Sequence, residues 1–84
     1  MNKRKILKKA LAGSKSIRFA EMVGLVQGFG FRLARVSGSH NIFIHPDVSE
    51  LLNLQQIDGK AKPYQIRQFL RLVERYNLRL GDDS

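Results

Sequence analysis

The sequence predicts an α+β sandwich in which helices cover one face of a small antiparallel sheet. Apolar residues recur at helical spacing before residue 30 and again after residue 63. Three strand-like runs follow one another between them, separated by small turns. Strands joined by short turns pair antiparallel, and flanking helices stack on one face. With 84 residues the chain makes one domain at most, with a modest core.

The N-terminal region is expected to be a short amphipathic helix over residues 3–12. Its apolar stripe, which should dock on the body of the protein, consists of Ile6, Leu7, Ala10 and Leu11. Gly13 stands where a C-terminal cap belongs. We therefore divide the domain into a basic helical extension over 1–15, a core over 16–80 and a polar tail over 81–84.

A second helix is predicted after a connector over residues 14–18. Its apolar positions follow the i, i+3, i+4, i+7 pattern and are Phe19, Met22, Val23, Val26 and Phe29. Gly30 can end this helix. Gly24 and Gly28 are four residues apart, so they lie on one side, where another part of the chain can approach closely.

Three strands are expected over 31–36, 41–45 and 51–56. Ser37-Gly38-Ser39 supplies the first turn, and Pro46-Asp47 begins the second. The consecutive apolar residues of the middle strand predict cover on both faces, by the helices on one side and by a partner protein as a candidate on the other.

The last helix is the clearest element, and Pro63 suits its first position. The predicted buried stripe is Ile66, Phe69, Leu70, Val73 and Tyr76. An exposed basic ridge consists of Arg67, Arg71 and Arg75.

The composition restricts the function classes. Fifteen basic and seven acidic residues give a net charge of +8, which attracts phosphate backbones or acidic proteins. The absence of cysteine excludes disulfides and thiolate metal sites, and it fits a reducing compartment. No apolar run approaches the roughly 20 residues of a membrane span, so we expect a cytoplasmic protein with no membrane partner.

His40, after the small turn, is the candidate catalytic residue. An ordinary imidazole exchanges protons near neutral pH, so it can remove the proton of an RNA 2′-hydroxyl. Gly38 and Ser39 allow a phosphate to approach and offer N–H donors. The alternative is a surface histidine beside a turn. His45 lies an odd number of residues away, which points it to the other face of the strand and makes it a strand-end residue. Neither a metal site nor a cofactor is predicted.

The start of the last helix is a candidate phosphate site. Lys60 and Lys62 precede it, no capping side chain stands at its N-terminus, and its first turn contains no acid. Unpaired N–H groups, the helix dipole and two lysines together favour an anion. The alternative is two solvated lysines before a helix.

These residues resemble the HicA (YcfA-like) toxins, small messenger-RNA interferases of bacterial type II toxin–antitoxin pairs. The resemblance covers about residues 17–80. It rests on a lysine-led last helix over 60–70 and on the motifs Gly28-Phe29-Gly30-Phe31, Leu33 with Arg35, Gly38-Ser39-His40, Ile42-Phe43 and His45-Pro46-Asp47. It implies a double-stranded-RNA-binding-like α-β-β-β-α sandwich, to which the N-terminal helix is an addition.

The resemblance also implies roles for the candidate residues. His40 would catalyse metal-independent RNA cleavage, and Lys60 and Lys62 would touch phosphate. We expect Arg35 to help these lysines to hold or neutralise the phosphate. The implied partners are messenger RNA and a HicB-like antitoxin. Asn41 stands where many members have a second histidine, which leaves the general acid unassigned. Two alternatives therefore stay open: a double-stranded-RNA-binding module without catalysis, and a protein whose basic surface serves an acidic protein partner.

Overall fold

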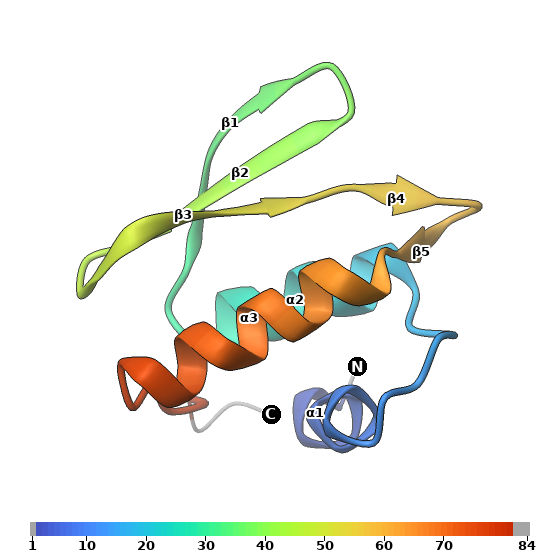
Figure 1. Ribbon diagram of the computed structural model, residues 1–84, viewed down its shortest axis with the longest axis horizontal. Helices are drawn as coiled ribbons and strands as arrows, with labels where there is room; N and C mark the ends of the chain where they lie inside the picture. Colours follow the sequence, from blue (N-terminus) through green and yellow to red (C-terminus); the bar gives the residue numbers. More distant parts are fainter. Residues whose placement is uncertain (1, 82–84) are drawn as a thin grey trace.

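The computed structural model describes residues 2–81 and confirms the α+β class. Helices and strands follow in the order α1 (Lys3–Leu11), α2 (Phe19–Gly28), β1 (Arg32–Ser37), β2 (His40–His45), β3 (Val48–Leu54), β4 (Gln56–Ile57), β5 (Lys60–Ala61) and α3 (Pro63–Arg75). Strands β1, β2 and β3 form an antiparallel sheet in that order, and β4 pairs with β5. The helices lie on one side of the sheet (Figure 1). Only Gly81 of the predicted tail lies within the described residues.

The helices are layered on this one face. Helix α3 packs against β3, while α1 packs against α2 and α3 on the side away from the sheet. As predicted, α1 is followed by Gly13 with a φ of +80°, and α2 by Gly30 with a φ of +97°. Both angles are ones that a side chain opposes, so the two glycines end their helices for a steric reason. No helix within residues 2–81 is long and apolar enough to cross a membrane.

The region between the third strand and the last helix differs from the prediction. Strand β3 begins three residues earlier than the expected 51–56 and ends at Leu54, and a second hairpin, β4–β5, follows it. Asp58 and Gly59 form its turn with φ angles of 53° and 76°. An Asp-Gly pair with both φ angles positive is typical of a two-residue hairpin. The Asp58-Gly59 pair is therefore the sequence signal of this hairpin, which the predicted strand over 51–56 did not include.

One hydrophobic cluster joins the three helices to the sheet. Its largest fully buried apolar side chains are Phe43, Phe69, Ile17, Met22, Leu25, Leu52, Leu54 and Val26. Ile6 and Ala10 belong to the same cluster, which confirms that α1 docks on the body. The prediction for Leu11 was wrong, since this side chain is 67% exposed at the last turn of α1. Leu25 and Leu72 are buried although the predicted stripes omitted them.

The C-terminal segment approaches α2 at Gly28. The N–H of Gly81 donates to the Gly28 carbonyl over 2.9 Å. A Cβ atom at Gly28 would stand 2.8 Å from the Leu80 side chain and 2.9 Å from that of Lys3. The predicted close approach is therefore found at this glycine.

The two faces of the sheet are unequal. Phe43 on β2 is buried against the helices, together with its cross-strand partner Leu52. Ile42 and Ile44 are only half-buried, and Leu51 on the neighbouring strand is exposed. The helices thus cover one face only, and within residues 2–81 the second cover expected for β2 is absent.

Candidate functional site

The β1–β2 turn presents His40 at the exposed end of the sheet. Ser37 pairs with His40, which leaves Gly38 and Ser39 as a two-residue turn. Gly38 has a φ of +59° and Ser39 does not have a positive φ, the pattern of a type II′ turn. A Cβ at Gly38 would meet nothing within 4 Å, so glycine is required here by backbone conformation rather than by space.

One nitrogen of the His40 ring is held and the other is free. Its Nδ1 lies 3.2 Å from Oδ1 of Asn53, on the adjacent strand β3. Within residues 2–81 its Nε2 has no hydrogen-bond partner, and the side chain is exposed. The ring is therefore oriented by one contact and available through the other nitrogen.

Gln55 connects this histidine to the start of α3. Its Oε1 accepts hydrogen bonds from Asn53 Nδ2 at 3.2 Å, from Gln65 Nε2 at 3.0 Å and from Lys62 Nζ at 3.5 Å. Its Nε2 donates to Ser39 Oγ at 3.3 Å. Three predicted site residues, Ser39, His40 and Lys62, are thus brought into one hydrogen-bond network. Asn53, Gln55 and Gln65 were not predicted, since neutral amides carry no sequence signal of a site.

The side chain of Asn41 links the β1–β2 turn to β3. Its Nδ2 donates to the Ser39 carbonyl at 3.4 Å and to the Leu54 carbonyl at 3.1 Å. Both of these contacts are to main-chain carbonyls. Asn41 therefore supports the position of His40 and supplies no proton donor for chemistry.

The N-terminus of α3 has the predicted features of a phosphate site. Lys62 is the N-cap residue and makes no side-chain cap, Pro63 follows at the first helical position, and the first turn has no acid. Lys60 and Lys15 line the same shallow hollow as Lys62, and so does the acidic Asp58. Lys15 was missed because it comes from the distant connector after α1. The β1–β2 turn and the start of α3 lie at the same end of the molecule (Figure 1).

Arg35 lies on the same sheet face as His40 but outside this network. It is paired across the strands with Ile42, the second residue after His40 on β2. Its side chain is exposed and makes no hydrogen bond or ion pair within residues 2–81. It adds positive charge beside the turn.

His45 has a structural role, as predicted for a strand-end residue. Its Nε2 lies 3.1 Å from the Phe29 carbonyl, and its Nδ1 accepts the Asp47 N–H over 3.0 Å. The ring meets Phe31 edge-on, with centroids 5.0 Å apart. His45 thus faces the core side while His40 faces away from it. Within residues 2–81 no three side chains of a type that binds metals gather closely enough to hold an ion.

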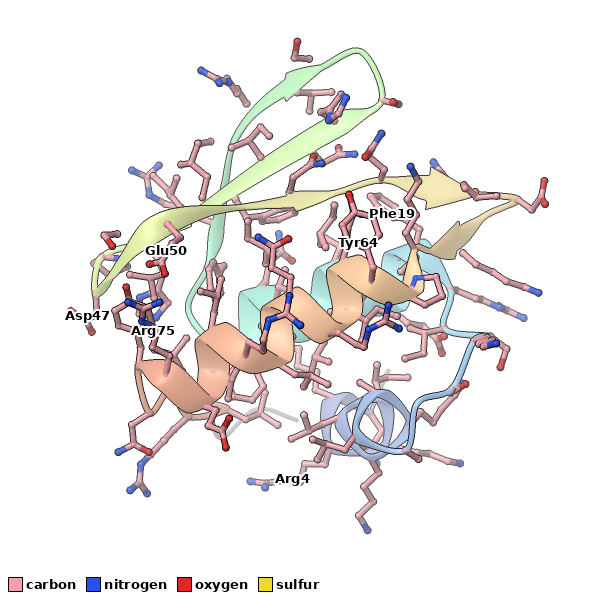
Figure 2. The ribbon with its side chains drawn as sticks, in the orientation of Figure 1. Arg4, Phe19, Asp47, Glu50, Tyr64 and Arg75 are labelled. Atoms are coloured by element: carbon pink, nitrogen blue, oxygen red, sulfur yellow. The ribbon has the colours of Figure 1, made fainter. Side chains whose placement is uncertain are left out.

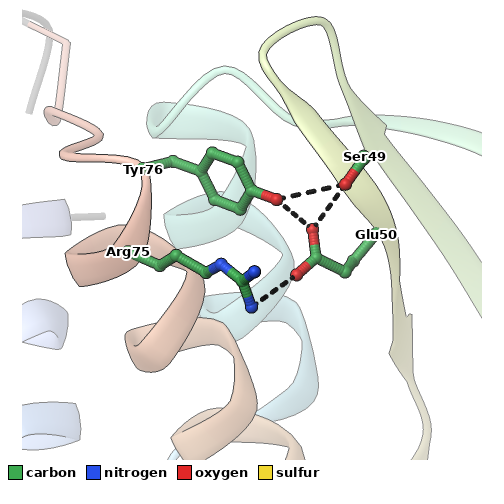
Figure 3. A network of polar contacts seen from close by, with 4 residues as sticks. All are labelled: Ser49, Glu50, Arg75 and Tyr76. Carbon is green, nitrogen blue, oxygen red and sulfur yellow. Dashed lines mark hydrogen bonds and ion pairs between the residues drawn. The ribbon is translucent and has the colours of Figure 1, made fainter.

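A second polar cluster lies where β3 begins, at the other end of β2 from His40. Figure 3 shows this cluster from close by. Glu50 accepts from the hydroxyls of Tyr76 and Ser49 and pairs with Arg75 Nη1 at 3.3 Å. Figure 2 shows Glu50 and Arg75 together at this end, far from Tyr64 near the start of α3. The Tyr76 hydroxyl, assisted by Ser49 and Arg75, holds the pKa of Glu50 below its ordinary value of 4.5, although partial desolvation acts in the opposite direction. This cluster ties the end of α3 to β3.

No protein-family model, curated protein or solved structure matches this chain. The residues themselves therefore carry the argument about function.

Proposed function

We propose that this protein is a HicA-like toxin, a metal-independent messenger-RNA interferase that acts in the cytoplasm. The observation that carries the proposal is the imidazole of His40, which is oriented through Nδ1 and has no hydrogen-bond partner at Nε2 within residues 2–81. It stands on an exposed turn and shares a hydrogen-bond network with Lys62, the N-cap residue of α3. The net charge of +8 supplies the attraction for a polyanion.

The proposed reaction uses the nucleophile that RNA contains. Nε2 of His40 accepts the proton of a 2′-hydroxyl, whose oxygen then forms a bond to the adjacent phosphorus. The bond from phosphorus to the 5′-oxygen breaks, giving a 2′,3′-cyclic phosphate and a 5′-hydroxyl. Lys62 and Lys60 neutralise the charge that accumulates on the phosphate oxygens. The leaving 5′-oxygen takes its proton from solvent, so the step balances without a second acid–base residue.

The arrangement of the site also supports a double-stranded-RNA-binding-like fold. Domains of this kind recognise duplex RNA largely by shape and backbone rather than by sequence. Lys60 and Lys62 stand immediately before α3, and the small Gly38-Ser39 turn lies at the same end of the molecule. The half-buried Ile42 and Ile44 and the exposed Leu51 form the uncovered apolar face on which we place a HicB-like antitoxin.

A double-stranded-RNA-binding module without catalysis is the second candidate. The observation that favours it is Asn41, whose amide is committed to main-chain carbonyls and leaves no second acid–base group beside His40. Such a module binds through the same lysines, and its affinity falls steeply with salt. Purified protein would then bind RNA and leave it intact.

The test compares the wild type with His40→Ala for RNA cleavage, RNA binding and growth arrest on expression. We expect a 10²- to 10⁴-fold loss of cleavage, the range of general acid–base catalysis, with RNA affinity nearly unchanged. Thermal unfolding checks that the variant folds, and cleavage in EDTA tests independence from metal. Cleavage at the wild-type rate by folded His40→Ala would contradict the proposal. Binding without cleavage by the wild type would favour the second candidate.

A further inference from the structure

We infer that a relay of three side-chain amides, from Gln65 through Gln55 to Asn53, fixes the tautomer of His40. The tautomer follows from hydrogen bonds alone. Its consequence for cleavage rests on the proposed function. The relay makes Asn53 and Gln55 positioning residues for the imidazole.

The relay begins at a group that can only donate. The main-chain N–H of Gln55 lies 2.7 Å from the side-chain amide of Gln65, so the atom facing it must be the carbonyl oxygen Oε1. Gln65 is 1% exposed, so neighbouring protein groups rather than solvent fix the orientation of its amide. Its NH₂ group consequently points at the side chain of Gln55, 3.0 Å away.

The second amide is oriented by two independent donors. The NH₂ of Gln65 requires an acceptor, which makes the facing atom of Gln55 its oxygen. The ammonium of Lys62, 3.5 Å from the same atom, also has only hydrogens to offer, so this longer contact favours the same orientation. The Gln55 NH₂ then faces Ser39 Oγ, which accepts its hydrogen.

The third amide, that of Asn53, is oriented by Gln55 and faces the His40 ring. Asn53 must present its NH₂ to the Gln55 oxygen at 3.2 Å, so its own oxygen faces Nδ1 of His40. An oxygen acceptor at 3.2 Å requires a hydrogen on Nδ1. The neutral ring therefore keeps its lone pair on Nε2, the nitrogen that is free and exposed. This is the atom that a general base needs, because it is the one a substrate can reach.

His45 provides an internal reference with the opposite tautomer. Its Nδ1 accepts the Asp47 N–H, and its Nε2 must therefore carry the hydrogen that is donated to the Phe29 carbonyl. Two histidines on one strand thus have opposite proton placements. A method that reads the tautomers of both rings contains its own control.

The experiment is long-range ¹H–¹⁵N NMR of the full chain labelled on its histidine ring nitrogens, at a pH where both rings are neutral. In the wild type we expect the Nδ1–H form for His40 and the Nε2–H form for His45. Detection of His40 mainly as Nε2–H, the form preferred by free histidine, would overturn the inference.

Matched substitutions test the direction of the relay. Asn53→Leu removes the acceptor and should return His40 to the Nε2–H form, while Asn53→Asp keeps an acceptor and should retain Nδ1–H. One step further away, Gln55→Leu should return part of the His40 population to the Nε2–H form. Gln55→Glu still accepts from Asn53 and should retain the Nδ1–H form. Unchanged His45 signals show that each variant folds. Retention of Nδ1–H in folded Asn53→Leu would refute the relay.

Kinetics separates the two proposals. Asn53→Leu should lower kcat for RNA cleavage roughly 10-fold with KM unchanged, as expected for a partner that orients a functional imidazole. Asn53→Asp should restore most of kcat. If the wild type does not cleave RNA, the proposed function fails while the measured tautomer stands. If it cleaves RNA with His40 in the Nε2–H form, the relay fails and the function survives.

Discussion

The two ends of strand β2 carry the only two histidines of the chain, and they use their ring nitrogens differently. At His45 both nitrogens bond to main-chain groups, and the ring packs against Phe31. At His40 one nitrogen bonds to a side-chain amide and the other has no partner within residues 2–81. The comparison teaches that a histidine saturated by main chain is a structural element, while a half-saturated one keeps its chemistry available.

The difference has a physical origin in what each partner can do. Main-chain groups are placed by the fold, so replacing His45 leaves the carbonyl of the buried Phe29 without its partner. Asn53 is half-buried, but the His40 ring that it contacts is exposed, so water can take the place of the imidazole. We therefore expect substitutions at His45 to lower stability and substitutions at His40 to lower activity.

The largest expected change in stability comes from His45→Ala. The variant loses two hydrogen bonds to main chain and the edge-on contact with Phe31. We expect a loss of about 2–3 kcal/mol in the free energy of unfolding, measured by urea denaturation. For a chain with roughly 4–12 kcal/mol in total, this is a large fraction.

The control for this prediction is His40→Ala, which should change the free energy of unfolding by less than about 0.5 kcal/mol because the residue is exposed. Equal destabilisation by the two variants would remove the distinction between the ends of the strand.

Gly30→Ala should have the next largest effect on stability, because the added methyl group would clash with the His45 ring. A Cβ there would stand 2.9 Å from His45 Nε2, and φ is +97°. We expect about 2 kcal/mol of destabilisation, the sum of backbone strain and a clash with a ring held in place. Thermal or urea unfolding measures it.

Gly13→Ala is the matched control for this substitution. Its φ is +80°, and a Cβ there meets nothing within 4 Å, so it reports strain alone, about 1 kcal/mol. In a His45→Ala background the extra cost of Gly30→Ala should largely vanish. Persistence of the full cost in that background would show that His45 is not the neighbour that matters.

The sequence predicted the features that local pattern determines. Helices α1, α2 and α3 appear where the 3.6-residue period placed them, and Gly13, Gly30 and Pro63 stand at the expected boundaries. The odd spacing of the two histidines correctly predicted opposite faces. These successes share a cause, since periodicity, turn chemistry and capping act over a few residues.

The features that sequence reasoning missed depend on contacts between distant residues. Asn53 and His40 are 13 residues apart, and Gln55 and Gln65 are 10 apart, so only the sheet register and the docking of α3 bring them together. Neutral amides have no periodicity that marks them as network members. The predicted burial of Leu11 was wrong for a related reason. Its helical spacing is that of the apolar stripe, but no distant part of the chain within residues 2–81 covers it.

Glu50→Gln is expected to have the smallest effect, and it tests the cluster at the His45 end through pH. The Tyr76 hydroxyl, the main cause, lowers the pKa of Glu50 from its ordinary value of 4.5. The unfolded chain then binds this proton more readily than the folded one, so the carboxylate stabilises the fold at neutral pH. That contribution is lost as the pH falls below 4.5 and through the lower pKa of the folded state.

The variant should therefore be slightly less stable than the wild type at neutral pH, and the gap should close on acidification. The difference is small because Glu50 is partly exposed and its pair with Arg75 is screened by solvent. Thermal unfolding from neutral pH to below 4 measures it. Tyr76→Phe, which removes the main cause of the low pKa, should reproduce most of this pH dependence. A gap that widens on acidification would mean that Glu50 binds its proton more tightly in the folded chain, contrary to the arrangement of Tyr76, Ser49 and Arg75 around it.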